Sequence, residues 1–354
     1  MVSLRKEVKV GNHVIGDNSP CFIIAEAGGN HNLIFEQALK LIDIASDAGA
    51  TAVKFSLSRA ETQYPPNAGY ARYLGAETPI YEIIKKREVP FDWIPDLVRY
   101  SRDKKLIFLC SSFDEKTTDV LAENDIEAFK VASYEATHQP LLKHIARKGK
   151  PIIMSTGVTS LDELRESVEI IMKEGNNQLI LMHCVGAYPA PIEDSNLRVI
   201  ETLKKEFGCP VGISDHSRNP VIVPICAAAL GANIMEKHFT ISKLLPGPDH
   251  PFALEPQELK MMVESVQMAK KALGSPEKVI TPSERELYSF ARRSIFTTCS
   301  VKKGERLTAA NTAVLRCGQH KPVLKPKEYD RLIGSKVKKN LKAYEIIREE
   351  DFEK

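Results

Sequence analysis

Two histidines stand at the ends of two short segments, SDH (214–216) and EKH (236–238). Each segment follows a buried, strand-like run, where a charged group costs several kcal/mol unless it is paired or binds a ligand. If the two strands are neighbours, about 5 Å apart, His216 and His238 can reach one divalent cation. Two imidazoles leave open coordination positions, as a catalytic metal requires. Two separately hydrogen-bonded histidines are the alternative explanation.

A second group of residues has the chemistry of a phosphate site. Lys54 and Lys130 lie near the ends of two other strand-like runs, and each ammonium can act as a point charge toward an anion. The remaining hydrogen bonds could come from Ser133, Ser155, Ser214 and the flexible backbone at Gly157. Each of these residues alone fits a solvated rim. Together with a metal, they indicate chemistry on a phosphorylated substrate.

Polar residues follow nearly every strand-like run, which a purely structural core would not require. Besides the histidines, lysines and serines named above, these polar residues are Glu26, Ser111, Glu135 and His183. The segment LPGPDH (245–250) would present Asp249 over the same region, although a simple tight turn explains its prolines better.

The elements that must hold these residues alternate along the chain. Strand-like runs cover 22–26, 52–56, 106–110, 128–132, 151–155, 179–184, 210–214 and 233–239. Most are near-continuous apolar runs, typical of parallel strands covered on both faces. Helical spacing is clearest at 35–49, 160–175 and 255–274. Eight strand–helix units over about 250 residues predict an α/β fold, a (β/α)8 TIM barrel with its catalytic groups at the C-terminal strand ends. A doubly wound open sheet is the competitor, but its GxGxxG loop is absent.

The C-terminal part of the chain has a different pattern. We expect a barrel domain at 1–280, a linker at 281–291 and a small β-rich domain at 292–354. In the last of these, VKKGERLTAAN (301–311) resembles LKAYEIIREED (341–351) at an offset of 40 residues, which predicts two similar turns. This domain has 16 Lys and Arg against 8 Asp and Glu. Such a charge fits nucleic acid, an anionic small molecule or a solvated face.

The composition is that of an ordinary globular protein. The 354 residues are 43% hydrophobic and 27% charged. We find no apolar run of about 18 residues and no signal peptide, so we expect no membrane association. Seven cysteines without a CxxC pair predict neither a disulfide framework nor a structural zinc site. We therefore expect a cytoplasmic protein.

Many of these segments also resemble one protein family. They are FIIAEAGGNH (22–31), AVKF (52–55), FKVASYE (129–135), PIIMSTG (151–157), YPAP (188–191), GISDHS (212–217), EKHFT (236–240) and LPGPDH (245–250). In this order they resemble the sialic acid synthases, which are phosphoenolpyruvate-dependent nonulosonate synthases, and most closely the spore-coat polysaccharide synthases of the spsE type. The tail, with ARRSIFTTCSVKKGE (291–305) and VLRCGQ (314–319), resembles the SAF (antifreeze-like) domain of that family.

The resemblance implies a transferase that condenses phosphoenolpyruvate with an open-chain N-acetylhexosamine, such as N-acetylmannosamine. His216 and His238 match ligands of a divalent metal, usually Mn²⁺, with Mg²⁺ or Co²⁺ as alternatives, and Glu26 matches a catalytic carboxylate that orients or deprotonates water. The phosphoenolpyruvate positions match Lys54, Ser111, Lys130, Ser133, Ser155 and Ser214, and the sugar positions match Glu135, Tyr188 and Asp249. Arg316 matches a residue that reaches the partner's barrel in a domain-swapped homodimer. The basic tail would then face an active-site anion rather than nucleic acid.

Some positions depart from the family pattern, and other functions compete. The departures are Ser56-Leu57, Cys110-Ser111-Ser112 and Val185-Gly186, which leave the identity of the acceptor open. A 2,4-diacetamido-trideoxyhexose of the legionaminate or pseudaminate type, or a spore-coat sugar, is the alternative acceptor. More distant rivals are a metal-dependent hydrolase, whose first-strand His-x-His is replaced by Ala25-Glu26-Ala27, and a Schiff-base aldolase using Lys54 or Lys130. A non-catalytic binding protein is disfavoured because an ice-binding face needs small uncharged residues.

Overall fold

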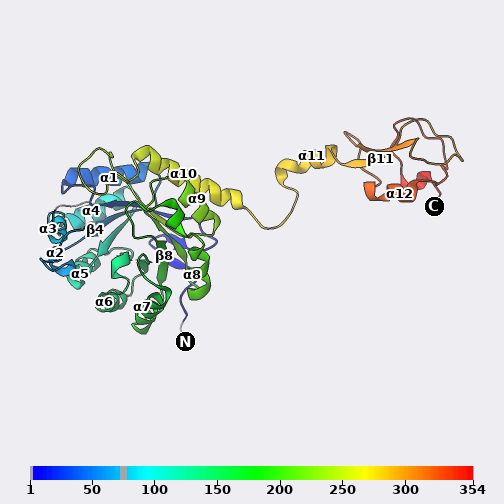
Figure 1. Cartoon of the computed structure of the whole chain (residues 1–354). Coiled ribbons are helices and arrows are strands. Elements are labelled where there is room, and N and C mark those ends of the chain that lie inside the picture. Colours follow the sequence, from blue (N-terminus) through cyan, green and yellow to red (C-terminus); the bar gives the residue numbers. More distant parts are fainter. Residues whose placement is uncertain (1–2, 72–77, 354) are drawn as a thin grey trace. The chain divides into compact units, whose positions relative to one another are not determined.

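The computed structural model describes residues 3–71 and 78–353. The chain divides into two compact units, Met1–Gly274 and Ser275–Lys354 (Figure 1). The division falls at Gly274, whereas the sequence placed the end of the barrel domain at residue 280. The segment expected to be a linker, 281–291, contains the 3₁₀ turn η4 (Pro282–Glu284) and the helix α11 (Arg285–Phe290).

The first unit contains a closed parallel barrel, which confirms the predicted (β/α)8 fold. Its strands follow one another around the barrel in the order β10-β3-β4-β5-β6-β7-β8-β9. They are β3 (Phe22–Gly28), β4 (Ala52–Leu57), β5 (Ile107–Ser112), β6 (Phe129–Val131), β7 (Ile152–Ser155), β8 (Leu179–Cys184), β9 (Val211–Asp215) and β10 (Ile234–His238). Each lies within two residues of the run expected from the sequence.

Helices surround the barrel (Figure 1). They are α1 (Phe35–Asp47), α2 (Ala60–Gln63), α3 (Ile80–Lys85), α4 (Trp93–Asp103), α5 (Glu115–Glu123), α6 (Gln139–Arg147), α7 (Leu161–Lys173), α8 (Val199–Phe207), α9 (Ile222–Ala229) and α10 (Pro256–Leu273), with the 3₁₀ turns η2 (Ser133–Glu135) and η3 (Ile192–Ser195). The predicted start of α7 is a capping box, because the Ser160 hydroxyl accepts from the Glu163 N–H and the Glu163 carboxylate accepts from the Ser160 N–H. Within the described part of the chain, no helix is both long and apolar enough to cross a membrane.

The barrel interior changes from apolar to polar along the strands. Side chains alternate between the two faces of a strand, so Ile24 lies on the same face as Glu26, and Ala52 on the same face as Lys54. The apolar inner layers pack against the hairpin β1 (Val8–Val10) and β2 (His13–Ile15), whose buried residues belong to the same cluster. The interior is therefore filled near the strand starts, and the polar residues gather at the C-terminal ends.

The second unit is small and contains the predicted internal repeat. Its elements after α11 are β11 (Arg293–Thr297), β12 (Thr312–Arg316), η5 (Pro326–Glu328), α12 (Tyr329–Leu332) and η6 (Glu349–Asp351). Val301 and Leu341 exchange two backbone hydrogen bonds. In each half a glutamate accepts from the backbone N–H three residues earlier, Glu305 from Lys302 and Glu345 from Lys342. The two similar turns that the sequence predicted are thus present and face each other.

Candidate active site

One cavity of about 560 Å³ opens at the C-terminal end of the barrel. It is lined by nearly all the residues that the sequence singled out, namely Glu26, Lys54, Ser111, Lys130, Ser133, Glu135, Ser155, Tyr188, Ser214, His216, His238 and Asp249. Gly157 lies beside the cavity, where its backbone N–H donates a hydrogen bond to the Ser133 hydroxyl. Arg316 ends β12 in the second unit, where its side chain is exposed. His183 is buried away from this cavity, with its Nε2 against the Ser195 carbonyl.

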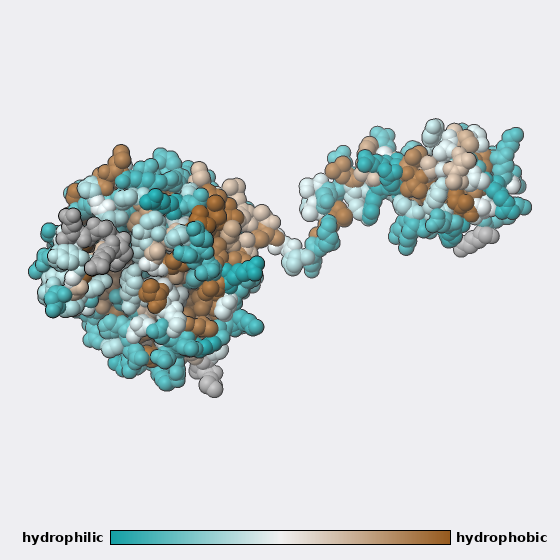
Figure 2. All heavy atoms as spheres, viewed as in Figure 1, coloured by the Kyte–Doolittle hydropathy of each residue, from teal (hydrophilic) through white to brown (hydrophobic). Residues whose placement is uncertain are grey.

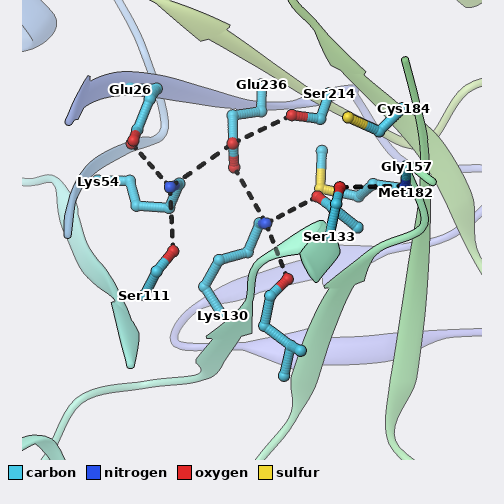
Figure 3. Close-up of polar contacts among 12 residues, drawn as sticks. Glu26, Lys54, Ser111, Lys130, Ser133, Gly157, Met182, Cys184, Ser214 and Glu236 are labelled. Carbon is cyan, nitrogen blue, oxygen red and sulfur yellow. Dashed lines mark hydrogen bonds and ion pairs between the residues drawn. The ribbon is translucent and has the colours of Figure 1, made fainter. Parts of the chain in front are cut away.

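Two lysines and two glutamates form a buried network at the bottom of the cavity (Figure 3). The Lys54 ammonium lies 2.9 Å from the Glu26 carboxylate and 3.6 Å from that of Glu236. The Lys130 ammonium lies 3.8 Å from the other oxygen of Glu236. Lys54 also donates to the Ser111 hydroxyl. Glu236 therefore stands between the two ammonium groups.

Burial and the neighbouring charges divide the protonation behaviour of the two glutamates. Burial raises the pKa of Glu26 to about 7, because Lys54 offsets only part of the desolvation and Glu236 adds repulsion. Burial acts on Glu236 in the same direction, but Lys130 and Lys54 outweigh it and hold its pKa at about 2. Glu236 is thus the permanent counterion, and Glu26 can exchange a proton near neutral pH.

A cluster of donors around Lys130 has the composition expected for an anion site. The ammonium donates to the Ser155 hydroxyl at 2.8 Å and to the Val131 carbonyl at 3.1 Å. Burial lowers the pKa of Lys130, and the nearby Glu236 offsets only part of this effect. Nearby, the Gly157 N–H donates to the Ser133 hydroxyl at 3.0 Å (Figure 3), and a Cβ at Gly157 would lie only 2.9 Å from that oxygen. A side chain at position 157 would therefore disturb the cradle.

The two predicted metal-binding histidines lie side by side. The rings of His216 and His238 are 5.4 Å apart between centroids, at an interplanar angle of 72°. Burial lowers the pKa of each imidazole to about 3, so both are neutral at pH 7. The Nδ1 atom of His216 lies 2.8 Å from the Val185 carbonyl. Because a carbonyl only accepts, this contact puts the proton on Nδ1 and leaves Nε2 as a lone-pair donor.

These two histidines fit a divalent cation. Metal ligation requires neutral imidazoles, and both rings are neutral. The Nδ1 atom of His238 is buried with no hydrogen-bond partner among residues 3–71 and 78–353. In the same described ranges, no third His, Cys, Asp or Glu completes a cluster of three with metal-binding geometry. The donor set is therefore two nitrogens, which leaves positions open for water or substrate.

The predicted sugar-binding residues lie on loops around the cavity. Tyr188 stacks on the His216 ring with centroids 4.1 Å apart. Burial raises the pKa of Glu135, on η2, to about 7. Asp249 lies 4.0 Å from the guanidinium of Arg87. These three side chains come from different parts of the chain and line the same cavity, and their role toward a sugar stays what the family resemblance implies.

Several lining residues were not assigned a role from the sequence. The sequence showed only that Glu236 stands near the end of a strand. Its position between Lys54 and Lys130 depends on how β10, β4 and β6 come together in the barrel. Others come from the segment between β4 and α4, where Ile80, Ile83 and Ile84 form an apolar part of the cavity wall. His31 lines the cavity too and packs on Trp93. A short helix and a lone histidine have no pattern in the sequence that would have revealed them.

Comparison with known proteins agrees with this arrangement. The model of the NeuB family matches residues 41–278, and that of the SAF domain matches residues 292–353. The chain is 43% identical over 339 residues to the spore coat polysaccharide biosynthesis protein SpsE of Bacillus subtilis, covering 92% of this chain and 91% of the relative. The chain belongs to the NeuB family. Within the family, it is 37% identical to the N,N'-diacetyllegionaminic acid synthase of Campylobacter jejuni, covering 92% of this chain and 98% of that one.

A solved sialic acid synthetase is similar to most of this chain. The N-acetylneuraminic acid synthetase of Leptospira borgpetersenii, crystallised with citrate, is 34% identical and superposes with a TM-score of 0.72 over 81% of this chain and 97% of that one. Two of the positions that depart from the expected family pattern, Ser56 and Val185, contact the site. Ser56 lines the cavity, and Val185 supplies the carbonyl that fixes the His216 ring.

Proposed function

We propose that this protein is a nonulosonate synthase, which condenses phosphoenolpyruvate with an open-chain N-acetylated amino sugar and releases phosphate. The observation that carries the proposal is the pairing, in one cavity of a NeuB-family barrel, of two buried ammonium groups with two neutral histidines. The ammonium groups suit the phosphate and carboxylate of phosphoenolpyruvate. The histidines suit a cation beside them.

In this proposal the basic residues bind phosphoenolpyruvate. Lys130 with Ser155 and Lys54 with Ser111 are two ammonium–hydroxyl pairs, each already hydrogen-bonded in the protein. Their donors replace water around the anionic groups and fix the orientation of the enol. Ser133 and Ser214 are placed to add hydroxyl contacts. Glu236 maintains the charge of both lysines when the ligand leaves.

The reaction forms a bond between C3 of phosphoenolpyruvate and the aldehyde carbon and a bond between C2 and the oxygen of water, and it breaks the bond between C2 and the bridging oxygen. One proton leaves the water, and one proton joins the former aldehyde oxygen. C3 of phosphoenolpyruvate attacks the sugar aldehyde, water adds at C2, and phosphate then leaves with the bridging oxygen. A divalent cation, Mn²⁺ by preference or Mg²⁺ or Co²⁺, would be held by His216 and His238 and would supply Lewis-acid polarisation of the aldehyde. Glu26 accepts the proton of the water, which its pKa of about 7 allows at neutral pH.

The wall of the cavity supports an acceptor with apolar substituents. Ile80, Ile83 and Ile84 of α3 line a cavity whose floor is ionic. Acetamido methyl groups, or the methyl of a 6-deoxy sugar, can pack on such a wall, whereas a free hydroxymethyl group gains less. The acceptor is thus N-acetylmannosamine or a 2,4-diacetamido-trideoxyhexose, and the apolar wall favours the latter.

Arg316 belongs to this proposal through a domain-swapped homodimer, in which it would contact the sugar of the partner's cavity. Support comes from large apolar side chains near the division between the two units. Those of Leu273, Val279, Ile280, Leu287, Tyr288 and Phe290 are each at least 44% exposed, and Figure 2 shows apolar surface on both units. Apolar surface of this kind marks interaction sites. We also place the protein in the cytoplasm, because all seven cysteines are free thiols.

The test is phosphate release from phosphoenolpyruvate by the purified protein with Mn²⁺, using N-acetylmannosamine and a 2,4-diacetamido-trideoxyhexose in parallel. We expect release with only one of the two sugars, abolished by EDTA and by His238→Ala. The matched control is His144→Ala, whose imidazole pairs with Asp119 on the outside of the barrel and should leave release unchanged. Release without any sugar, or release that survives EDTA, would refute the proposed reaction.

A further inference from the structure

The side chain of Lys237 points away from the cavity and is only 1% exposed. Its ammonium donates to the Asp215 carboxylate at 2.5 Å, to the carbonyl and hydroxyl of Ser217 at 2.5 and 3.1 Å, and to the Asn219 carbonyl at 3.2 Å. All four oxygens come from the turn 215–219, between β9 and α9. We call them the Lys237 cage.

The same turn carries His216. At its start, the second oxygen of Asp215 accepts from the Ser217 N–H at 2.8 Å. At its end, the Asn219 side chain accepts from the N–H groups of Val221 and Ile222, where α9 begins. The cage therefore joins both ends of the turn to one atom of β10.

The register of the two strands places the cage directly behind the histidines. Asp215 and Lys237 are paired across β9 and β10 and face outward. Ser214 and Glu236, one residue earlier on each strand, face inward and are hydrogen-bonded at 3.2 Å (Figure 3). The residues one position later are His216 and His238, which bring their rings together in the cavity. The outward pair thus lies between two inward pairs.

Stability alone gives a weak reason for this ion pair. Both side chains are buried, at 2% and 3% exposure, and desolvation offsets most of the attraction between buried charges. A network that fixes one turn instead gives a defined position to the groups on that turn. Partners that hydrogen-bond a metal-binding histidine directly typically contribute about 10- to 100-fold in metal affinity, and the cage acts on His216 one step further away, through the backbone of the turn.

We propose that Lys237 is a positioning residue for the metal site. Its cage fixes the turn 215–219 and so holds the imidazole of His216 at the distance from His238 that one divalent cation requires. This inference rests on the proposed function, in which both histidines bind the cation.

The experiment measures the dissociation constant for Mn²⁺ alone, by electron paramagnetic resonance of the free ion, with the full-length protein and no substrate. The main variant is Lys237→Met with Asp215→Asn, which removes both charges and keeps an acceptor for the Ser217 N–H. We expect Mn²⁺ binding to weaken by about 10-fold, the lower end of the range for direct partners of a ligand. With phosphoenolpyruvate and sugar present, turnover should return toward the wild-type kcat as Mn²⁺ is raised, which a simple loss of folded protein would not produce.

The matched control is Lys243→Met, which breaks an ion pair with Glu258 whose side chains are 34% and 32% exposed. This variant should change Mn²⁺ affinity by less than about twofold. Ser217→Ala keeps both charges and removes one cage hydroxyl, so it decides the question if the double variant does not fold. We expect weakening of at least about threefold for it.

Unchanged Mn²⁺ affinity in a folded cage variant would overturn the role of Lys237 and leave the proposed function standing. Failure of the wild-type protein to bind Mn²⁺ would overturn both.

Discussion

Replacing Lys130 with methionine removes an ammonium that is buried at the end of β6. Glu236 would not be left alone, because Lys54 lies 3.6 Å from it and the Ser214 hydroxyl donates to it. The buried charge of Lys130 is itself unfavourable, since burial lowers its pKa. Removing one partner of a buried ion pair usually costs about 3–5 kcal/mol, because the other charge is left without a partner. Glu236 keeps Lys54, so we expect Lys130→Met to change the free energy of unfolding by no more than about 1 kcal/mol.

The loss should appear in ligand binding instead. A hydrogen bond to a charged group contributes about 1.5–3 kcal/mol, so the affinity for phosphoenolpyruvate should fall by about 10- to 150-fold. Isothermal titration gives the affinity, and urea unfolding of the same samples gives the stability. Lys150→Met is the matched control, because its ion pair with Asp125 lies outside the cavity and its loss should leave phosphoenolpyruvate binding intact. Unchanged affinity in Lys130→Met, or a stability loss above about 3 kcal/mol, would refute the reasoning.

Three further predictions concern other parts of the site. Burial raises the pKa of Glu135 to about 7 from an ordinary value of 4.5, so the folded state binds the proton more tightly than the unfolded state and loses stability as the pH rises from 4.5 to 7. In urea unfolding, the stability of Glu135→Gln relative to wild type should therefore increase by about 2 kcal/mol between pH 5 and pH 8. The same relative stability at both pH values would contradict this. Mn²⁺ at about 100 times its dissociation constant should stabilise the wild type by about 2.7 kcal/mol in thermal unfolding, and the same gain in His216→Ala would argue against ligation. Coexpressed Glu26→Gln and Arg316→Ala chains should regain about a quarter of wild-type activity if the dimer is swapped, and no gain would exclude that arrangement.

The barrel was predictable because its strands have a simple apolar pattern. The run ending in Ile24 and Ala25 could only be a strand covered on both faces, and Glu26 at its end had to meet the other strand ends. The repeat in the second unit was predictable for a similar reason. Glu305 and Glu345 occupy equivalent places in two turns, and equal local chemistry gave equal local hydrogen bonds.

The rest depends on contacts between residues far apart in the chain. Arg87 approaches Asp249, and nothing near either residue indicates the other. Glu236 is a buried carboxylate whose partners come from β4 and β6, so its sequence neighbours do not reveal its role. Side chains alternate along a strand, so Lys237 faces away from Glu236 and His238, but the oxygens of its cage come together only when the turn 215–219 folds.

The most direct test of the proposed reaction uses phosphoenolpyruvate labelled with ¹⁸O in the oxygen that bridges C2 and phosphorus. After incubation with Mn²⁺ and the accepted amino sugar, mass spectrometry gives the position of the label. The proposed condensation predicts ¹⁸O in the released phosphate and an unlabelled nonulosonate that contains the carbons of both substrates. Label retained in the keto acid, or phosphate released without a product of that mass, would contradict it.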